Sequence, residues 1–223
     1  MNNNHLPLIK TIGHTWENEA LLEQALTLAY GSKKAPYERL EFLGDRVLGL
    51  VIAEMLYKHF PKENEGDLAK RHTKLVRAET AVLVAEEIGL EHYLNVAKSE
   101  EAVVNSKPEV YLCDVLEAVI GALYIDGGFD VAKDFVVKYF HSLMIKDKVP
   151  PQDSKSKLQE WAQGKGFEIP KYTVQKVIGP EHAPIFTIAV EVGNFEIVTA
   201  AGSSKKKAEQ NAAKAFLMQH KVF

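Results

Sequence analysis

The spacing of apolar residues changes class near residue 150, and this change limits the fold more than any other feature. Before it, apolar residues recur at helical spacing, as in WENEALLEQALTLAY at 16–30. After it, IFTIAVEV at 185–192 alternates as strands do. Between them, KDKVPPQDSKS at 146–156 is rich in Pro, Asp, Ser and Lys and has no periodicity. The sequence therefore predicts two domains of different class joined by an exposed linker.

The first domain is predicted to be all helical, with Pro61, Gly89 and the pair Gly127 and Gly128 as helix stops. Its helical patterns cover 16–30, 36–60, 63–90, 109–126 and 130–145.

The second domain is predicted to be a small α+β unit of order α-β-β-β-α, with helices packed on one face of an antiparallel sheet. Its patterns cover a helix at 156–166, strands at 171–179, 185–192 and 195–202, and a helix at 203–220. The predicted boundaries are 1–147 for the helical domain, 148–153 for the linker and 154–223 for the α+β domain.

Charge is distributed unevenly between the two predicted domains. From residue 151 onward the chain has ten lysines and seven acids, whereas the remainder has 17 basic and 23 acidic residues. An acidic domain can collect metal cations, and a lysine-rich domain can neutralise nucleic-acid phosphates. One polyanionic partner would therefore suit both domains.

Several classes of protein are disfavoured by what the sequence lacks. No apolar run reaches the roughly 18 residues of a membrane span, and MNNNHLPLIK lacks the layout of a secretion signal, so we expect a cytoplasmic protein without membrane contact. Cys113 is the only cysteine, so we expect no internal disulfide and no cysteine-based zinc site. The absence of GxxxxGK[ST], GxGxxG and HExxH motifs argues against a nucleotide cofactor and a histidine-bound metal.

Acidic residues share a face of one predicted helix and recur in another. In ERLEFLGDRVL at 38–48, Glu38, Glu41 and Asp45 lie at i, i+3 and i+7. Their neighbours are mostly apolar, so we expect partial burial, where unpaired carboxylates are costly or protonated. In LCDVLEAVIGAL at 112–123, Asp114 and Glu117 are the only charged residues. Two such helices packed face to face would bring four carboxylates together.

Two interpretations of these acids are open. Acids beside Arg39 and Arg46 can form ordinary surface ion pairs, and an N-terminal helical position explains Glu38 equally well. Asp114 and Glu117 have no basic partner in their helix, so binding of a hard cation explains them better. All-oxygen ligands favour Mg²⁺ or Mn²⁺ over zinc, and Mg²⁺ held by a few carboxylates commonly acts on phosphates.

The last predicted helix begins with cations, which the helix dipole disfavours. GSSKKKAEQNAA at 202–213 places Ser203 or Ser204 at the N-cap and Lys205, Lys206 and Lys207 in the first turn. A solvated lysine run is the simplest alternative. Because the triplet follows a strand and opens a helix, a phosphate bound by the ammonium and free backbone N–H groups is the better explanation.

These motifs together resemble bacterial ribonuclease III. ERLEFLGDRVL at 38–48 is followed by NEGDLAKRHTKLV at 64–76 and LCDVLEAVIGALYIDGG at 112–128, and the tail is similar to a double-stranded RNA-binding domain. The resemblance implies an all-α endonuclease domain followed by a small α+β double-stranded RNA-binding domain. It also implies Mg²⁺-dependent hydrolysis of double-stranded RNA, with Mn²⁺ able to substitute, leaving 5′-phosphate ends and short 3′ overhangs.

The resemblance assigns roles to individual acids. It makes Glu41, Asp114 and Glu117 metal ligands, and we expect Asp45 and Glu117 to be the catalytic residues nearest the attacking water. Glu38 and Glu65 match acids that support the geometry of the site.

The resemblance also assigns residues to the RNA and to a second subunit. Phe42 matches an aromatic residue inserted into the partner subunit of a homodimer, although packing considerations alone would place it in the core. The implied RNA-binding residues are Gln159, Glu160 and His182 at successive minor grooves and Ser204, Lys205, Lys206 and Lys207 at the phosphates between them.

The flank of the signature departs from the family pattern, because Leu28, Tyr30 and Tyr37 replace residues that form a Thr-His-x-Ser stretch and an Asn in other members. The implied substrates are ribosomal RNA precursors and messenger and transfer RNAs. The alternative function is that of a non-catalytic double-stranded RNA-binding protein that keeps the nuclease fold as a dimer scaffold.

Overall fold

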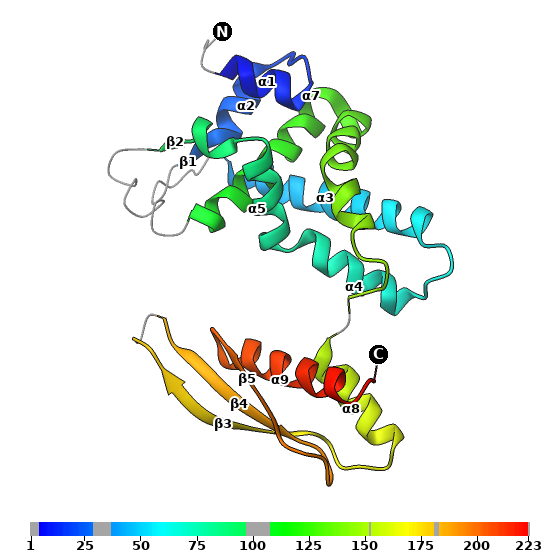
Figure 1. The fold of residues 1–223 in the computed structure, drawn as a ribbon. Coiled ribbons are helices and arrows are strands. Elements are labelled where there is room, and N and C mark those ends of the chain that lie inside the picture. Colours follow the sequence, from blue (N-terminus) through cyan, green and yellow to red (C-terminus); the bar gives the residue numbers. More distant parts are fainter. Residues whose placement is uncertain (1–4, 29–36, 97–107, 152, 181–182, 223) are drawn as a thin grey trace. The chain divides into compact units, whose positions relative to one another are not determined.

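A computed structural model describes residues 5–28, 37–96, 108–151, 153–180 and 183–222. The chain forms two compact units, Met1–Pro151 and Gln152–Phe223 (Figure 1). Each unit has its own hydrophobic core. Within the described ranges, no helix has the length and apolar character needed to cross a bilayer.

Helices dominate the first unit, as the sequence predicts. A short 3-10 helix, η2 (Leu90–Tyr93), precedes the two-residue strand β2 (Asn95–Val96). This strand pairs in parallel with β1 (Thr27–Leu28). The helices are α1 (Leu6–Ile12), α2 (Glu19–Leu26), α3 (Glu38–His59), α4 (Glu65–Val76), α5 (Ala78–Glu87) and α7 (Pro108–Ile145).

Two helix predictions are wrong in extent. The helix expected over 16–30 begins only at Glu19 and ends at Leu26, because Thr27 is extended and pairs with Asn95. The helix expected over 63–90 is two helices, interrupted at Arg77, whose φ of −72° and ψ of 154° are extended. At this break the Thr80 hydroxyl donates a hydrogen bond to the carbonyl oxygen of Lys74 at 2.7 Å. This oxygen would otherwise accept from a backbone N–H of a continuing helix.

The predicted stop at the Gly127–Gly128 pair is confirmed as a sharp change of direction within α7. Gly128 has φ 82° and ψ −177°, a conformation that a side chain would strain. The helix before it carries the acids Asp114 and Glu117, and the helix after it closes the core. Glycine at this position therefore lets one continuous segment supply two differently directed helices.

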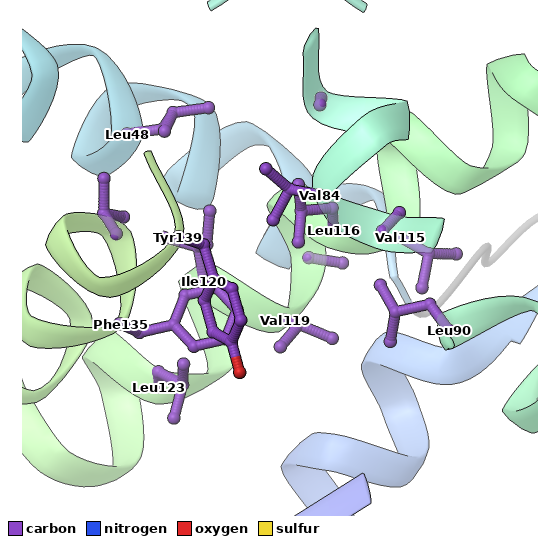
Figure 2. Close-up of a cluster of buried hydrophobic side chains, with 14 of the residues drawn as sticks. Leu48, Val84, Leu90, Val115, Leu116, Val119, Ile120, Leu123, Phe135 and Tyr139 are labelled. Carbon is purple, nitrogen blue, oxygen red and sulfur yellow. The ribbon is translucent and has the colours of Figure 1, made fainter. Parts of the chain in front are cut away.

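The core of the first unit lies mainly between α3, α5 and α7. Leu48 of α3, Val84 of α5, and Leu116 and Ile120 of α7 are fully buried and belong to one cluster, part of which Figure 2 shows. Burial of a leucine or isoleucine side chain of this kind contributes about 1.5–3 kcal/mol. The α3 and α7 helices are therefore held together by apolar packing on the same segments that carry the acids.

The second unit confirms the predicted α-β-β-β-α order. Its elements are α8 (Ser154–Gly164), β3 (Lys171–Ile178), β4 (Ile185–Glu191), β5 (Val198–Gly202) and α9 (Lys205–Gln219). The strands form an antiparallel sheet of order β3-β4-β5, with a bulge between Val174 and Lys176. Leu158 of α8, Val190 of β4 and Phe216 of α9 share the core, so the two helices pack on one face of the sheet.

Candidate active site

The acids singled out in the sequence lie on the two helices at the centre of the first unit. Glu41 and Asp45 are partly buried on α3, and Asp114 and Glu117 are partly buried on α7. Glu38 begins α3 and is exposed. The partial burial expected for acids of the first of these helices is therefore found at Glu41 and Asp45 but not at Glu38.

Two glycines let α3 and α7 approach at the level of these acids. A Cβ atom added to Gly44, which lies between Glu41 and Asp45, would stand 1.7 Å from the carbonyl oxygen of Glu117. A Cβ added to Gly121 would stand 2.1 Å from the carbonyl oxygen of Leu40. Real atoms cannot come that close, so only glycine permits this contact between backbones. The crossing brings the acid-bearing turns of both helices together.

Sequence reasoning missed the role of these glycines, although a signal was available. Glycine inside a helix costs about 0.5–1 kcal/mol relative to alanine, so Gly44 and Gly121 within long apolar helices call for a packing explanation.

The electrostatics show that the carboxylates of the two helices act on one another. Burial, followed by repulsion from Asp114, Glu38 and Asp45, raises the pKa of Glu41 to about 7. Burial, followed by repulsion from Asp45, raises the pKa of Glu117 to about 7, with smaller contributions from Glu41 and Asp114. Charges on both helices thus contribute to each of these shifts, which requires the helices to lie face to face.

Asp114 is displaced in the same direction by burial alone, which raises its pKa. Perturbed carboxylates of this kind are concentrated at functional sites, because a fold gains no stability by collecting like charges.

Basic partners distinguish Asp45 from the other three acids. Asp45 pairs with Arg46 at 2.7 Å, but the Arg46 side chain is exposed and that of Asp45 is only partly buried, so the pair contributes little stability. In the described part of the chain, no lysine, arginine or histidine forms an ion pair with Glu41, Asp114 or Glu117. The alternative interpretation, that these acids form ordinary surface ion pairs, therefore fits Asp45 in part and does not fit Glu41, Asp114 or Glu117.

The donor set has the chemistry of a hard-cation site. Carboxylate oxygens are the ligands that Mg²⁺ and Mn²⁺ prefer, and a divalent cation would offset the repulsion between these carboxylates. As the side chains stand, no three His, Cys, Asp or Glu residues of the described ranges form a group arranged to hold one ion. Repulsion gives a physical reason for like-charged side chains to stay apart until a cation draws them together.

The two acids expected to play supporting roles, Glu38 and Glu65, differ in their relation to the four carboxylates. Glu38 contributes to the raised pKa of Glu41 and so belongs electrostatically to the cluster. Glu65 is exposed in the first turn of α4, and within the described residues no hydrogen bond or ion pair joins it to the four acids.

The residues of the signature flank are buried where they are described. Leu28 and Tyr37 are part of the hydrophobic core, whereas Tyr30 lies outside the described residues. Phe42, by contrast, is 65% exposed, and the Arg46 guanidinium lies 5.4 Å from its ring centroid. Placing Phe42 in the core of its own chain is therefore wrong.

In the second unit, the expected phosphate-binding residues lie at the start of α9. Ser204 is the N-cap, and its hydroxyl accepts a hydrogen bond from the backbone N–H of Lys207 at 3.2 Å. The side chains of Lys205, Lys206 and Lys207 are all exposed, and the first turn contains no acid. The cations are thus free to meet a phosphate at this helix terminus.

The other expected RNA-binding residues are only partly described. Gln159 and Glu160 are exposed on α8. His182 lies outside the described residues.

Comparisons with known proteins agree with this organisation. Residues 18–143 match a family model described as ribonuclease-III-like, and residues 154–219 match the double-stranded RNA binding motif. A ribonuclease 3 of Methylocella silvestris is 46% identical over 215 residues, covering 95% of this chain and 90% of that protein. A ribonuclease 3 of Ehrlichia ruminantium is 43% identical, covering 93% of each.

Solved structures give the same result for the first unit. The nuclease domain of ribonuclease III from Campylobacter jejuni aligns with a TM-score of 0.60 at 32% identity, covering 66% of this chain and all of that one. A second structure of that domain, concerned with flexibility in a region involved in dimer formation, aligns with a TM-score of 0.57 at 34% identity, covering 62% and 99%.

Fold, acids and comparisons together define a helical nuclease domain followed by a double-stranded RNA-binding domain. The chain belongs to the ribonuclease III family. Its activity is that of a double-stranded-RNA-specific endoribonuclease, and this is favoured over a non-catalytic RNA-binding scaffold.

Proposed function

We propose that Glu41, Asp45, Asp114 and Glu117 form the hydrolytic centre, with Glu41, Asp114 and Glu117 holding Mg²⁺. The observation that carries this proposal is that burial, together with repulsion between the carboxylates on α3 and α7, raises the pKa of both Glu41 and Glu117 to about 7. Burial and mutual repulsion of carboxylates destabilise the folded state, and a bound cation would offset both effects.

The roles of the side chains follow from their chemistry. When bound, divalent cations supply Lewis-acid polarisation of the phosphate and lower the pKa of a bound water. Asp45 and Glu117 orient the attacking water and accept its proton. Glu38 adds negative charge to the cluster, and Glu65 supports substrate geometry from α4. The products are 5′-phosphate ends with short 3′ overhangs, and the substrates are structured ribosomal, messenger and transfer RNA precursors in the cytoplasm.

Metal removal tests the activity directly. A long RNA duplex incubated with the full chain and Mg²⁺ is expected to be cut into short duplexes, and excess EDTA is expected to stop cleavage while leaving binding in place. Mn²⁺ should restore the cleavage because its ligand preferences are similar. Denaturing gels measure cleavage and gel shifts measure binding. Binding without cleavage under both metals would instead support a non-catalytic scaffold.

We place the end of the nuclease domain at residue 147, the linker at 148–153 and the RNA-binding domain at 154–223.

Changing Lys205, Lys206 and Lys207 to glutamine should reduce affinity for duplex RNA by about ten-fold or more at physiological salt, since each lost phosphate contact also lowers the counterion release. The dependence of log Kd on log salt should flatten by up to about three units. Single-turnover cleavage at saturating enzyme should change far less.

Changing Lys214 to glutamine provides the matched control, because this exposed lysine lies in the same helix but away from its N-terminus. If the triple variant kept the wild-type affinity and salt slope, the phosphate-binding role of the triplet would be wrong.

We propose a homodimer formed through α3. Phe42, Leu50 and Tyr57 are 65%, 60% and 74% exposed, and their spacing of eight and seven residues keeps them near one helical face. An exposed apolar stripe of this kind marks an interaction surface, and a two-fold dimer would use it on both subunits. Support comes from the Campylobacter jejuni nuclease domain, whose structure is described in terms of a region involved in dimer formation.

A charge placed on this stripe should prevent dimerisation. Phe42→Asp is expected to sediment as a monomer at micromolar concentration, because the new carboxylate would be buried unpaired at the interface. Phe42→Leu keeps an apolar side chain and should remain dimeric. An unchanged sedimentation coefficient for Phe42→Asp would contradict the proposed interface.

A further inference from the structure

The only cysteine of the chain lies beside a proposed metal ligand. Cys113 precedes Glu117 by one helical turn on α7 and is 8% exposed. Its thiol donates a hydrogen bond to Oε1 of Glu117, with a sulfur–oxygen distance of 3.7 Å. Side chains four residues apart on a helix stack on one face, so the helix itself sets this contact.

The surroundings of Cys113 favour the protonated thiol, which is the form that donates a hydrogen bond. A cysteine thiol is ordinarily protonated at neutral pH, and burial of the Cys113 side chain favours this neutral S–H form over the thiolate. A neutral S–H group can approach a carboxylate without adding charge to a crowded acidic cluster.

The hydrogen bond matters because the surroundings of Glu117 otherwise oppose its charge. Burial and repulsion from Asp45, Glu41 and Asp114 all disfavour the negative charge of the Glu117 carboxylate. The hydrogen bond from Cys113 stabilises that charge. The glutamate side chain has three rotatable bonds, and ordering it costs conformational entropy. A donor one turn away restrains these rotations before a cation arrives.

We propose that Cys113 is a positioning residue, whose thiol restrains the Glu117 carboxylate within the acidic cluster before a metal ion binds. This inference rests on the proposed function, in which Glu117 is a ligand. It assigns to Cys113 no contact with metal or RNA. Its effect should be seen in metal affinity, through preorganisation of Glu117.

The hydrogen bond can be observed without metal or RNA. With a single cysteine, the infrared S–H stretching band of the full chain comes from one group. In metal-free protein the band is expected at lower frequency and higher intensity than in Glu117→Ala, where the acceptor is gone. Cys113→Ser removes the band and verifies its assignment. A band of equal frequency and intensity in the wild type and Glu117→Ala would overturn the proposal.

Metal binding tests the positioning role. Titration of the RNA-free full chain with Mn²⁺ is expected to show about two- to five-fold weaker binding for Cys113→Ala, the lower part of the range for one hydrogen bond, since a thiol is a weak donor. Cys113→Ser supplies a hydroxyl donor and should recover much of this loss. Val115→Ala controls for packing, because it shortens a fully buried side chain on the same helix without removing a donor to Glu117.

The outcomes separate this inference from the function on which it rests. Wild-type Mn²⁺ affinity in Cys113→Ala, or a loss equal to that of Val115→Ala and not recovered in Cys113→Ser, overturns the positioning role. Undiminished RNA cleavage by Glu117→Gln would instead overturn the proposed ligand set, whatever the infrared band shows.

Discussion

Replacement of Glu117 by glutamine is expected to lower the single-turnover rate of duplex RNA cleavage by about 10²–10⁴-fold, the range in which acid–base groups contribute. Glutamine has nearly the same shape but no charge, so it is a poor ligand for Mg²⁺ and cannot accept a proton from water. The rate is measured on a long duplex at saturating enzyme and Mg²⁺. Glu87→Gln, an exposed acid of α5, is the matched control and should cleave normally.

The same variant should gain stability, which separates loss of chemistry from loss of fold. Burial raises the pKa of Glu117 from 4.5 to about 7 in the folded chain, so the folded state binds a proton that the unfolded state releases between those values. The free energy of unfolding of the metal-free protein must therefore fall as the pH rises from about 4.5 to about 7. Glu41 acts in the same direction.

Above pH 7, the charged Glu117 destabilises the metal-free fold, and glutamine removes that charge. We expect Glu117→Gln to unfold in urea with about 1–2 kcal/mol more free energy than the wild type at pH 8 in EDTA, after allowance for solvent screening and coupling among the acids. At pH 4 the two proteins should differ little. A variant that is inactive and also less stable at pH 8 would show that Glu117 supports the fold rather than the chemistry.

Alanine at Gly44 is expected to lower the free energy of unfolding by about 3 kcal/mol or more, at the upper end of what overpacking costs. The added methyl group would lie 1.7 Å from the carbonyl oxygen of Glu117, and a backbone atom in the middle of a helix cannot move aside. The helices must separate instead, which displaces Asp114 and Glu117 from Glu41 and Asp45. Cleavage should fall even at temperatures where the variant stays folded.

Gly49 provides the control on the same helix. A Cβ added there would meet only the His72 ring at 3.7 Å, which is ordinary contact. Gly49→Ala should therefore be neutral or stabilising by up to about 1 kcal/mol, because alanine favours the helix. Gly121→Ala should behave like Gly44→Ala, since its methyl group would meet the backbone at Leu40. Equal stability of the Gly44 and Gly49 variants, measured by urea denaturation, would contradict the close-crossing argument.

The sequence predicted much of the fold because local periodicity carries much of the information. Helical spacing indicated α3 and both parts of α7, and strand-like runs, the second of them alternating, indicated the three strands of the second unit. The predictions failed where distant residues decide the local conformation. Thr27 leaves the helical pattern to pair with Asn95, nearly 70 residues away. Arg77 is extended, and the carbonyl of Lys74 is satisfied by Thr80 instead of by a continuing helix.

For the site, the sequence by itself showed that Asp114 and Glu117 have no basic residue in their helical segment and which acids share a helical face, because both follow from spacing within one segment. It could not determine how near α3 comes to α7, since that distance depends on packing between segments about 70 residues apart. The tertiary structure decided it through Gly44 and Gly121, whose missing side chains let two backbones meet. At that separation the charges of both helices act on Glu41 and Glu117, whereas more distant helices would leave these two residues ordinary partly buried acids.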